Sequence, residues 1–326
     1  MEGNGTRLNE TEVVCDINRN AVKRYWFYSS ITCSLFSFAG NVLIILVFCT
    51  TKKLRTTTNC FIANMAISDL FVPVMNMIHN VLFTSVESPL VTQVVGNILC
   101  KLTTFLFNTS YGVSMTSLVV ITVHRFYAVA FPVKTFKTSR TQSFKIRRVL
   151  LFSTWLGPVV VCGPFLGYSS YNSRRRDCYI DMAEERFVIW NIIFLSFFVA
   201  LPFLVMFVLY PVIVSRLVKR KIPWDFHSRS QRKRYKRNIS LTKMFVAIIT
   251  ALLLTYGSYQ VVYVIILFSS SSQWCRSFKM LAVVYPFPDI FHVINPLLYF
   301  IFCSAYREKV KNMFLCSNRR KNAKFN

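Results

Sequence analysis

The sequence predicts an all-α membrane protein, a bundle of seven transmembrane helices followed by a short amphipathic eighth helix. Two observations predict this fold: seven apolar stretches, and positive charge concentrated in alternate segments between them. A hydrocarbon core of about 30 Å requires about 20 apolar residues of helix to cross it. The seven stretches lie near residues 26–50, 59–83, 99–129, 149–168, 187–215, 241–268 and 278–303.

These spans divide the chain into three regions: a polar N-terminal segment over 1–24, the bundle over 25–303, and the eighth helix with a short tail over 304–326. The connecting loops are too short for a second globular domain. Residues 1–24 lack the apolar core of a signal peptide, so we expect the first span itself to direct insertion.

The distribution of Lys and Arg predicts the orientation of the bundle. Most of these 39 residues follow spans one, three, five and seven, whereas of the 13 acidic residues only Asp225 and Glu308 lie there. Short loops rich in Lys and Arg stay in the cytoplasm. We therefore expect a multi-pass plasma-membrane protein with an extracellular N-terminus and a cytoplasmic C-terminus. Charge in such strips suits anionic membrane lipid and argues against a nucleic-acid partner.

Glycosylation motifs agree with that orientation. Asn4 and Asn9 each begin an Asn-X-Thr triplet in the N-terminal segment, and such triplets are modified only on the lumenal side. Two further triplets begin at Asn108, within a span, and at Asn238, on the cytoplasmic side. We expect sugar on the first two asparagines and none on the other two.

Four cysteines fall on the extracellular side, where disulfide bonds persist. Cys100, at the outer end of span three, is predicted to pair with Cys178 in the loop after span four, which leaves Cys15 with Cys275. Sequence alone allows three pairings among four cysteines. The first predicted bond would tie the loop across the mouth of the bundle.

Charged side chains deep in the spans predict functional sites, because ionisable groups in a bilayer are costly. They are Asp69 in span two, Arg125 at the inner end of span three and Asp289 in span seven. Pro202 and Pro296 each remove a backbone hydrogen bond and give their helices a place to bend. Such bends allow a bundle to change shape.

An ordered set of motifs accompanies these residues: Gly40-Asn41 in span one, the run 64–70 in span two, Trp155 in span four, Tyr210 in span five, and 295–299, with the sequence NPLLY, in span seven. With these motifs, residues 26–316 resemble the rhodopsin-like, class A, G-protein-coupled receptors, and among them the neuropeptide receptors. The resemblance implies that an extracellular ligand, a neuropeptide in the first place, opens the cytoplasmic end of the bundle and activates a heterotrimeric G protein.

Other classes of function fit the sequence less well. We find no nucleophile with a placed base, no metal-ligand spacing and no phosphate-binding glycine loop, so no enzymatic activity is expected. A membrane transporter would carry more charge inside the bilayer or paired broken helices. A receptor of the same fold for nucleotide or phospholipid ligands is the closer alternative, because Arg174, Arg175 and Arg176 lie in the outer loop, although nearby acids nearly neutralise them.

The resemblance also implies an activation switch at the inner end. Arg125 is expected to meet tyrosines of neighbouring helices once the bundle opens. His124 stands where the family usually has an acid, and span six begins at Asn238 without an acid nearby. We therefore expect either raised ligand-independent signalling or a resting state held by other contacts. The predicted switch residues are His124, Arg125, Tyr210, Tyr256, Asn295, Pro296 and Tyr299.

Buried polar groups need partners, so Asn41, Asp69, Ser114 and Asn295 are expected to share a network through water. In the family such a cluster holds a sodium ion that favours the resting state, which makes Asp69 the candidate sodium ligand and sodium the one candidate cofactor. Phe291 supplies less polar support here than is usual. The alternative is a hydrated polar network without sodium.

The outer half of the bundle predicts the ligand class. Phe107 stands where amine receptors carry an aspartate, and Asp289 stands where opsins carry the lysine that binds retinal. Aromatic and amide groups with one deep acid suit a peptide, whose cationic group Asp289 would neutralise. The alternative is that Asp289 hydrogen-bonds a neighbouring helix through His79 or Tyr111. The predicted ligand-binding residues are His79, Thr104, Phe107, Asn108, Tyr111, Gln260, Tyr263, Tyr285 and Asp289.

After span seven, residues 304–315 have the pattern of an amphipathic helix lying on the membrane, with Tyr306, Val310 and Met313 toward lipid. Cys316, at the end of this helix, is a candidate palmitoylation site.

Overall fold

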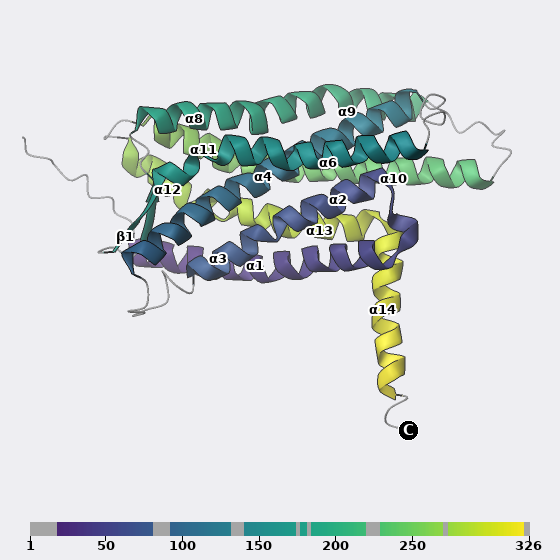
Figure 1. Cartoon of the computed structure of the whole chain (residues 1–326), viewed down its shortest axis with the longest axis horizontal. Coiled ribbons are helices and arrows are strands. Elements are labelled where there is room, and N and C mark those ends of the chain that lie inside the picture. The colour runs from purple at the N-terminus through teal and green to yellow at the C-terminus, as the bar shows by residue number, and fades with distance from the viewer. Residues whose placement is uncertain are drawn as a thin grey trace, which may run out of the picture.

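The computed structural model describes residues 18–80, 92–131, 140–173, 177–180, 184–219, 229–269 and 273–322. Within these residues, seven helices are long and apolar enough to cross a membrane, which confirms the predicted bundle. They run side by side along the length of the molecule (Figure 1). Their bounds are Asn20–Thr50, Thr57–His79, Gln93–Ala130, Phe144–Tyr168, Glu185–Lys219, Tyr235–Leu267 and Cys275–Phe302.

Several spans consist of more than one helical segment. In chain order the helices are α1 (Arg19–Thr50), η1 (Lys52–Leu54), α2 (Thr57–Asp69), α3 (Phe71–His79), α4 (Gln93–Ala130), α6 (Arg140–Cys162), α7 (Phe165–Tyr168), α8 (Glu185–Leu195), η3 (Ser196–Ala200), α9 (Leu201–Lys219), α10 (Arg229–Leu252), η4 (Leu253–Gly257), α11 (Ser258–Leu267), α12 (Trp274–Val284), α13 (Phe287–Phe302) and α14 (Ser304–Asn322).

Prolines explain most of the breaks inside spans. Span two divides just before Pro73, span five has the π-helical turn η3 just before Pro202, and span seven divides at Pro286. A proline lacks the amide hydrogen and pushes on the carbonyl four residues earlier, so the regular helix is interrupted there. Span six has no proline. Its interruption is the π-helical turn η4, which ends at Gly257.

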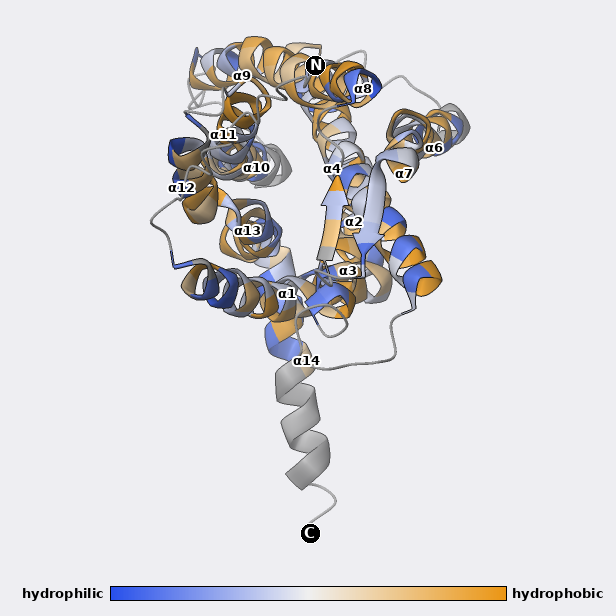
Figure 2. Cartoon of the chain, turned by 90° about the vertical axis from the view of Figure 1, so that its left-hand side faces the viewer, coloured by the Kyte–Doolittle hydropathy of each residue, from blue (hydrophilic) through white to orange (hydrophobic). Residues whose placement is uncertain are grey.

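The outward faces of the helices carry large apolar side chains. Phe207, Val218 and Phe268 are each more than 70% exposed, and in Figure 2 the outer sides of the helices show much of the apolar colour. A soluble protein rarely exposes apolar area on this scale. Lipid chains are therefore the natural surroundings of this surface.

A two-stranded hairpin lies across one end of the ring of helices (Figure 2). It consists of β1 (Ser169–Asn172) and β2 (Asp177–Ile180), antiparallel, with Tyr171 opposite Cys178. This is the loop after span four, where the sequence predicts a cover over the mouth of the bundle.

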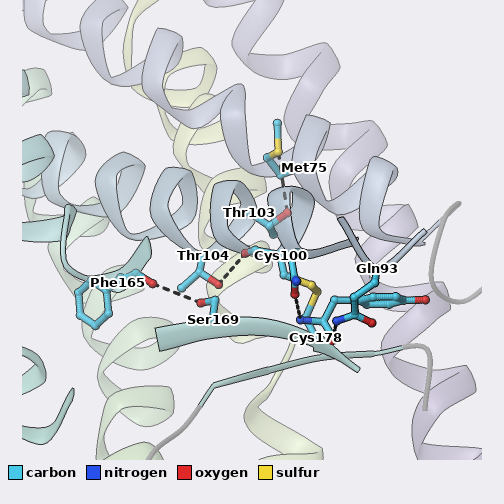
Figure 3. The surroundings of a disulfide bond; sticks show 10 residues. Met75, Gln93, Cys100, Thr103, Thr104, Phe165, Ser169 and Cys178 are labelled. Carbon is cyan, nitrogen blue, oxygen red and sulfur yellow. Dashed lines mark hydrogen bonds between the residues drawn. A yellow bond between two sulfur atoms is a disulfide. The ribbon is translucent and has the colours of Figure 1, made fainter. Parts of the chain in front are cut away.

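The hairpin is tied to α4 by a disulfide and by hydrogen bonds (Figure 3). Cys100 is bonded to Cys178, as predicted, with their Cα atoms 5.6 Å apart. The Gln93 side chain donates to the Tyr171 carbonyl over 2.6 Å, and the Tyr171 amide donates to Asn97 Oδ1 over 2.8 Å. The Tyr171 ring rests directly on Gly96, where any Cβ atom would collide with it.

Of the second predicted disulfide, the structure describes only Cys275. Cys275 is disulfide-bonded, and its partner is not among the described side chains. Asn4, Asn9, Cys15 and residues 174–176 lie outside the described residues, as does the side chain of Cys316. The free cysteines of the described part are Cys33, Cys49, Cys60, Cys162 and Cys303.

Helix α14 follows span seven directly and runs away from the bundle at a steep angle (Figure 1). Tyr306 in its first turn is fully buried and packs edge-on against Phe300, so the prediction that it faces lipid is wrong. The chain turns sharply at Cys303, and this turn brings the ring into the corner between α14 and the bundle. Val310 and Met313 also pack against the core, on the same side of α14.

Candidate functional site

Asp69 is the centre of a buried polar cluster that joins three spans. Its carboxylate is 0% exposed. Ser114 on α4 donates to Asp69 Oδ1 over 2.7 Å, and Asn295 on α13 donates to Oδ2 over 3.1 Å. A buried carboxylate requires such donors, because nothing else replaces its lost hydration. Two of the three predicted partners therefore contact Asp69 directly.

The third predicted partner, Asn41, lies beside this cluster on α1. Its side-chain amide donates to the Ser37 carbonyl over 3.0 Å, within its own helix. Its Oδ1 atom is buried and has no donor among the described residues. Asn41 is thus part of the polar region without a direct hydrogen bond to Asp69.

His292 is a member of the cluster that the sequence analysis missed. It lies on α13, is 1% exposed, and places its Nδ1 atom 3.2 Å from Asp69 Oδ1. Its Nε2 atom lies 3.2 Å from the hydroxyl of Tyr256 in the π-helical turn of span six. Helical spacing was the available signal, because Asp289, His292 and Asn295 follow one another at intervals of three and share a face.

Arg125 holds the inner ends of three spans together. Its guanidinium donates to Thr58 Oγ1 on α2 over 3.1 Å and to Asn238 Oδ1 on α10 over 3.4 Å. Neither acceptor is an acid, so neutral side chains hold Arg125 where the family usually supplies carboxylates.

The other switch residues are buried near the inner end without bonding Arg125. Tyr210 is buried, and its hydroxyl has no hydrogen-bond partner among the described residues. Tyr299 directs its hydroxyl to Met65 Sδ, 3.8 Å away. The Nδ1 atom of His124 is likewise buried without a described partner. The unpaired groups of Tyr210 and His124 are available for new hydrogen bonds if the inner end rearranges.

Asp289 lies on the same face of α13, nearer the hairpin end, and is 8% exposed. Asn76 on α3 donates to its Oδ1 atom over 2.9 Å. Asp289 therefore does hydrogen-bond a neighbouring helix, through Asn76 and not through the predicted His79 or Tyr111. Within the described residues, no Lys or Arg forms an ion pair with it.

Some of the predicted ligand-binding residues line the interior near the polar cluster. Tyr111 stacks on Tyr256, with ring centroids 4.2 Å apart, and Phe107 meets His292 edge-on. Thr104 and Asn108 are half-buried on α4 and donate to carbonyls of their own helix. His79 is half-buried on α3.

The remaining predicted ligand residues contact neighbouring helices. Tyr285 stacks on Trp26 of α1, with centroids 4.3 Å apart, and Tyr263 accepts a hydrogen bond from Asn191 of α8. Gln260 lines a groove of about 470 Å³ between spans five and six, whose other walls are almost wholly apolar. Among the described hydrogen bonds, none joins these three residues to Asp289.

Residues 40–299 match the sequence profile of the family described as 7 transmembrane receptor (rhodopsin family). The chain belongs to this family. It is 29% identical to a cholecystokinin receptor of Xenopus laevis over 63% of the chain and 46% of that receptor. It is 25% identical to the human KiSS-1 receptor over 88% of the chain and 73% of that receptor. It is 23% identical to the Tachykinin-like peptides receptor 86C of Drosophila melanogaster over 86% of the chain and 56% of that receptor.

The chain thus spans about half the length of the first of these relatives. The crystal structure of squid rhodopsin superposes with a TM-score of 0.73 at 19% identity, covering 91% of this chain and 87% of that one. At such low identity the likeness shows the fold alone. It agrees with the bundle described above.

The resemblance to the rhodopsin family implies a sodium ion beside the carboxylate of Asp69. The residues that surround Asp69 in this chain do not fit that ion. A hard cation prefers carboxylate, carbonyl and water oxygens, whereas imidazole suits transition metals. His292 occupies the space beside Asp69 Oδ1, and the neighbouring Phe291 presents an apolar ring that is 1% exposed. Of the nearby hydroxyls, that of Ser114 already donates to Asp69.

Proposed function

We propose that this rhodopsin-family receptor binds an extracellular peptide at the hairpin end of its bundle and activates a heterotrimeric G protein in the cytoplasm. The observation that carries the proposal is Asp289, a buried carboxylate whose charge no described Lys or Arg neutralises. A hydrogen bond from the neutral side chain of Asn76 holds it in place. A cationic group of a ligand would supply the missing countercharge.

The relatives support a peptide as the ligand. Those named above are receptors for cholecystokinin, for tachykinin-like peptides and for KiSS-1. The hairpin also suits a peptide, because it lies across the end of the bundle and its outer strand offers Tyr179, which is 49% exposed. A flexible ligand can contact this surface and place one side chain in the bundle.

We infer that activation is a shift between two populations of the receptor. In the closed form, Arg125 ties together the inner ends of α2, α4 and α10. A ligand that binds an open form more tightly draws the equilibrium toward that form by the difference in affinity. The open form would free Arg125 for the buried hydroxyls of Tyr210 and Tyr299, and its basic inner end would face the G protein and anionic lipid of the plasma membrane.

The experiment is a ligand screen on cells that express the chain, with dissociation of the G-protein subunits as the readout. Peptides with basic side chains, neutral peptides and nucleotides form its three arms. For an active basic peptide, Asp289→Asn should lower potency at least about tenfold, because a hydrogen bond to a charged group contributes about 1.5–3 kcal/mol.

Glu185→Gln is the matched control, since Glu185 is an exposed acid near the outer end of span five and should leave potency unchanged. Surface expression of both variants is measured in parallel. If the potency of the peptide at the Asp289→Asn receptor stays within threefold of its potency at the wild type, Asp289 is not the counter-ion of the ligand. Activation by nucleotides and by none of the peptides would refute the peptide assignment.

A further inference from the structure

The imidazole ring of His292 fills the space beside Asp69, and aromatic side chains pack around this ring. Tyr256 and Phe291 meet the imidazole at centroid distances of 6.1 and 5.8 Å, and Phe107 meets it at 6.5 Å. Cores packed in this way leave no space for a ring to turn aside. The imidazole therefore stays against the carboxylate unless the surrounding helices move.

We propose that a polar relay, Asp69–His292–Tyr256, takes the place of a sodium ion in this receptor, so that sodium does not act as an allosteric modulator of it. The relay connects span two, span seven and span six through two contacts of 3.2 Å each. In this arrangement a side chain of the receptor itself supplies the link to Asp69 that an ion would otherwise make.

Each ring nitrogen of His292 faces one polar neighbour. Nδ1 lies 3.2 Å from Asp69 Oδ1 in a polar contact that lacks hydrogen-bond geometry, and Nε2 lies within hydrogen-bonding distance of the Tyr256 hydroxyl. The imidazole therefore stands between the carboxylate and span six without any ion. Ser114 and Asn295 supply donors to the carboxylate, so both of its oxygens are occupied.

A cation at Asp69 would have to displace these donors. Moving the imidazole away would break its contact with Tyr256 and leave that buried hydroxyl without a partner, and an unpaired buried group is costly. Two amide oxygens, Asn41 Oδ1 and Asn295 Oδ1, lack a donor among the described residues. A single water can bridge such oxygens, since it needs polar partners and no countercharge.

The relay also connects span six to the polar cluster around Asp69. Tyr256 belongs to the π-helical turn of span six, and such turns are frequent where helices rearrange. A displacement of this turn would break its hydrogen bond to His292 and alter the environment of Asp69. The coupling of span six to the polar cluster is therefore made of polar contacts within the chain.

Thermal unfolding of the purified receptor tests the proposal directly. Melting midpoints are compared in sodium chloride and choline chloride at the same ionic strength. For the wild type we expect no sodium-specific difference. For His292→Ser, which replaces the imidazole by an oxygen ligand and opens space for an ion, we expect sodium to raise the midpoint by about 2 °C or more.

The double variant His292→Ser with Asp69→Asn should lose that rise, because the charged ligand is gone. His292→Asn serves the same purpose if the serine variant fails to fold, since it also offers an oxygen. A sodium-specific rise in the wild type that Asp69→Asn abolishes would overturn the proposal. Folded His292 variants without any response to sodium would show that His292 is not what replaces the ion.

Discussion

At the scale of single residues, the molecule is controlled by a few polar groups that the bundle excludes from water. Arg125 is the clearest case at the inner end. Its guanidinium is held by a hydroxyl from Thr58 and an amide oxygen from Asn238, over 3.1 and 3.4 Å. Neutral acceptors bind a buried cation less strongly than a carboxylate does. The closed form is therefore held weakly at this point.

Substitutions at Asn238 should change agonist-free signalling in opposite directions. Asn238→Asp offers Arg125 a carboxylate at the same place and should lower basal activity about threefold to tenfold, since a charge-assisted hydrogen bond is roughly twice as strong as a neutral one. Asn238→Leu removes the acceptor and should raise basal activity. Both are measured as G-protein activation per receptor at the cell surface.

The control is Asn312→Asp, which makes the same chemical change at an exposed position of α14. It should leave basal activity unchanged. Equal basal activity in Asn238→Asp, Asn238→Leu and the wild type would show that this contact does not hold the closed form.

At the scale of elements, two helices approach each other closely where one of them has a glycine. Spans one and seven meet at Gly40, where an added Cβ atom would lie 2.6 Å from Pro296 Cγ. Pro296 lies inside α13, where it removes one backbone hydrogen bond of that helix. The close approach thus fixes the position of α1 against the bend of span seven.

Gly40→Ala should destabilise the bundle, because the extra methyl must push two packed helices apart. Overpacking of this kind costs about 1–3 kcal/mol, and we expect a melting midpoint several degrees below that of the wild type. Gly157→Ala is the matched control. No atom lies within 4 Å of a Cβ placed at Gly157, which is exposed on α6.

The control variant should keep or slightly raise the melting midpoint, because alanine favours a helix over glycine by up to about 1 kcal/mol. Equal midpoints for the two alanine variants would show that the contact between Gly40 and Pro296 is not tight in the membrane-embedded receptor.

At the scale of the whole molecule, an apolar outer surface and a basic inner end determine how the receptor sits in a membrane. The helices expose large apolar side chains to lipid, as at Phe207. The hairpin covers one end of the bundle, and helix α14 leaves from the other (Figure 1). Because the Lys- and Arg-rich parts of α10, over 229–243, and of α14 lie at the α14 end, that end is expected in the cytoplasm.

Epitope tags at the two ends of the chain test this orientation. The N-terminal tag should be stained in intact cells and the C-terminal tag only after permeabilisation. Glycosidase treatment should increase the gel mobility of the wild type, and Asn4→Gln with Asn9→Gln should abolish that change. Asn238→Gln should retain it, because Asn238 lies beside Arg125 at the inner end. Staining of the C-terminal tag in intact cells would contradict the orientation.

The sequence by itself determined the seven spans, their order and the places of the motif residues. A chain in a bilayer has no water for its backbone, so a long apolar stretch must become a helix, and this property can be read one segment at a time. The disulfide between Cys100 and Cys178 was predicted in the same local way, and the structure contains it.

Only the tertiary structure decided which polar side chains meet. It joined Asp69 to His292, Asp289 to Asn76 and Arg125 to Asn238, and it turned Tyr306 into the core. Each contact depends on how far the helices are rotated and at what depth they cross. Rotation and depth are set by the packing of all seven helices together, and no single stretch of sequence contains that information.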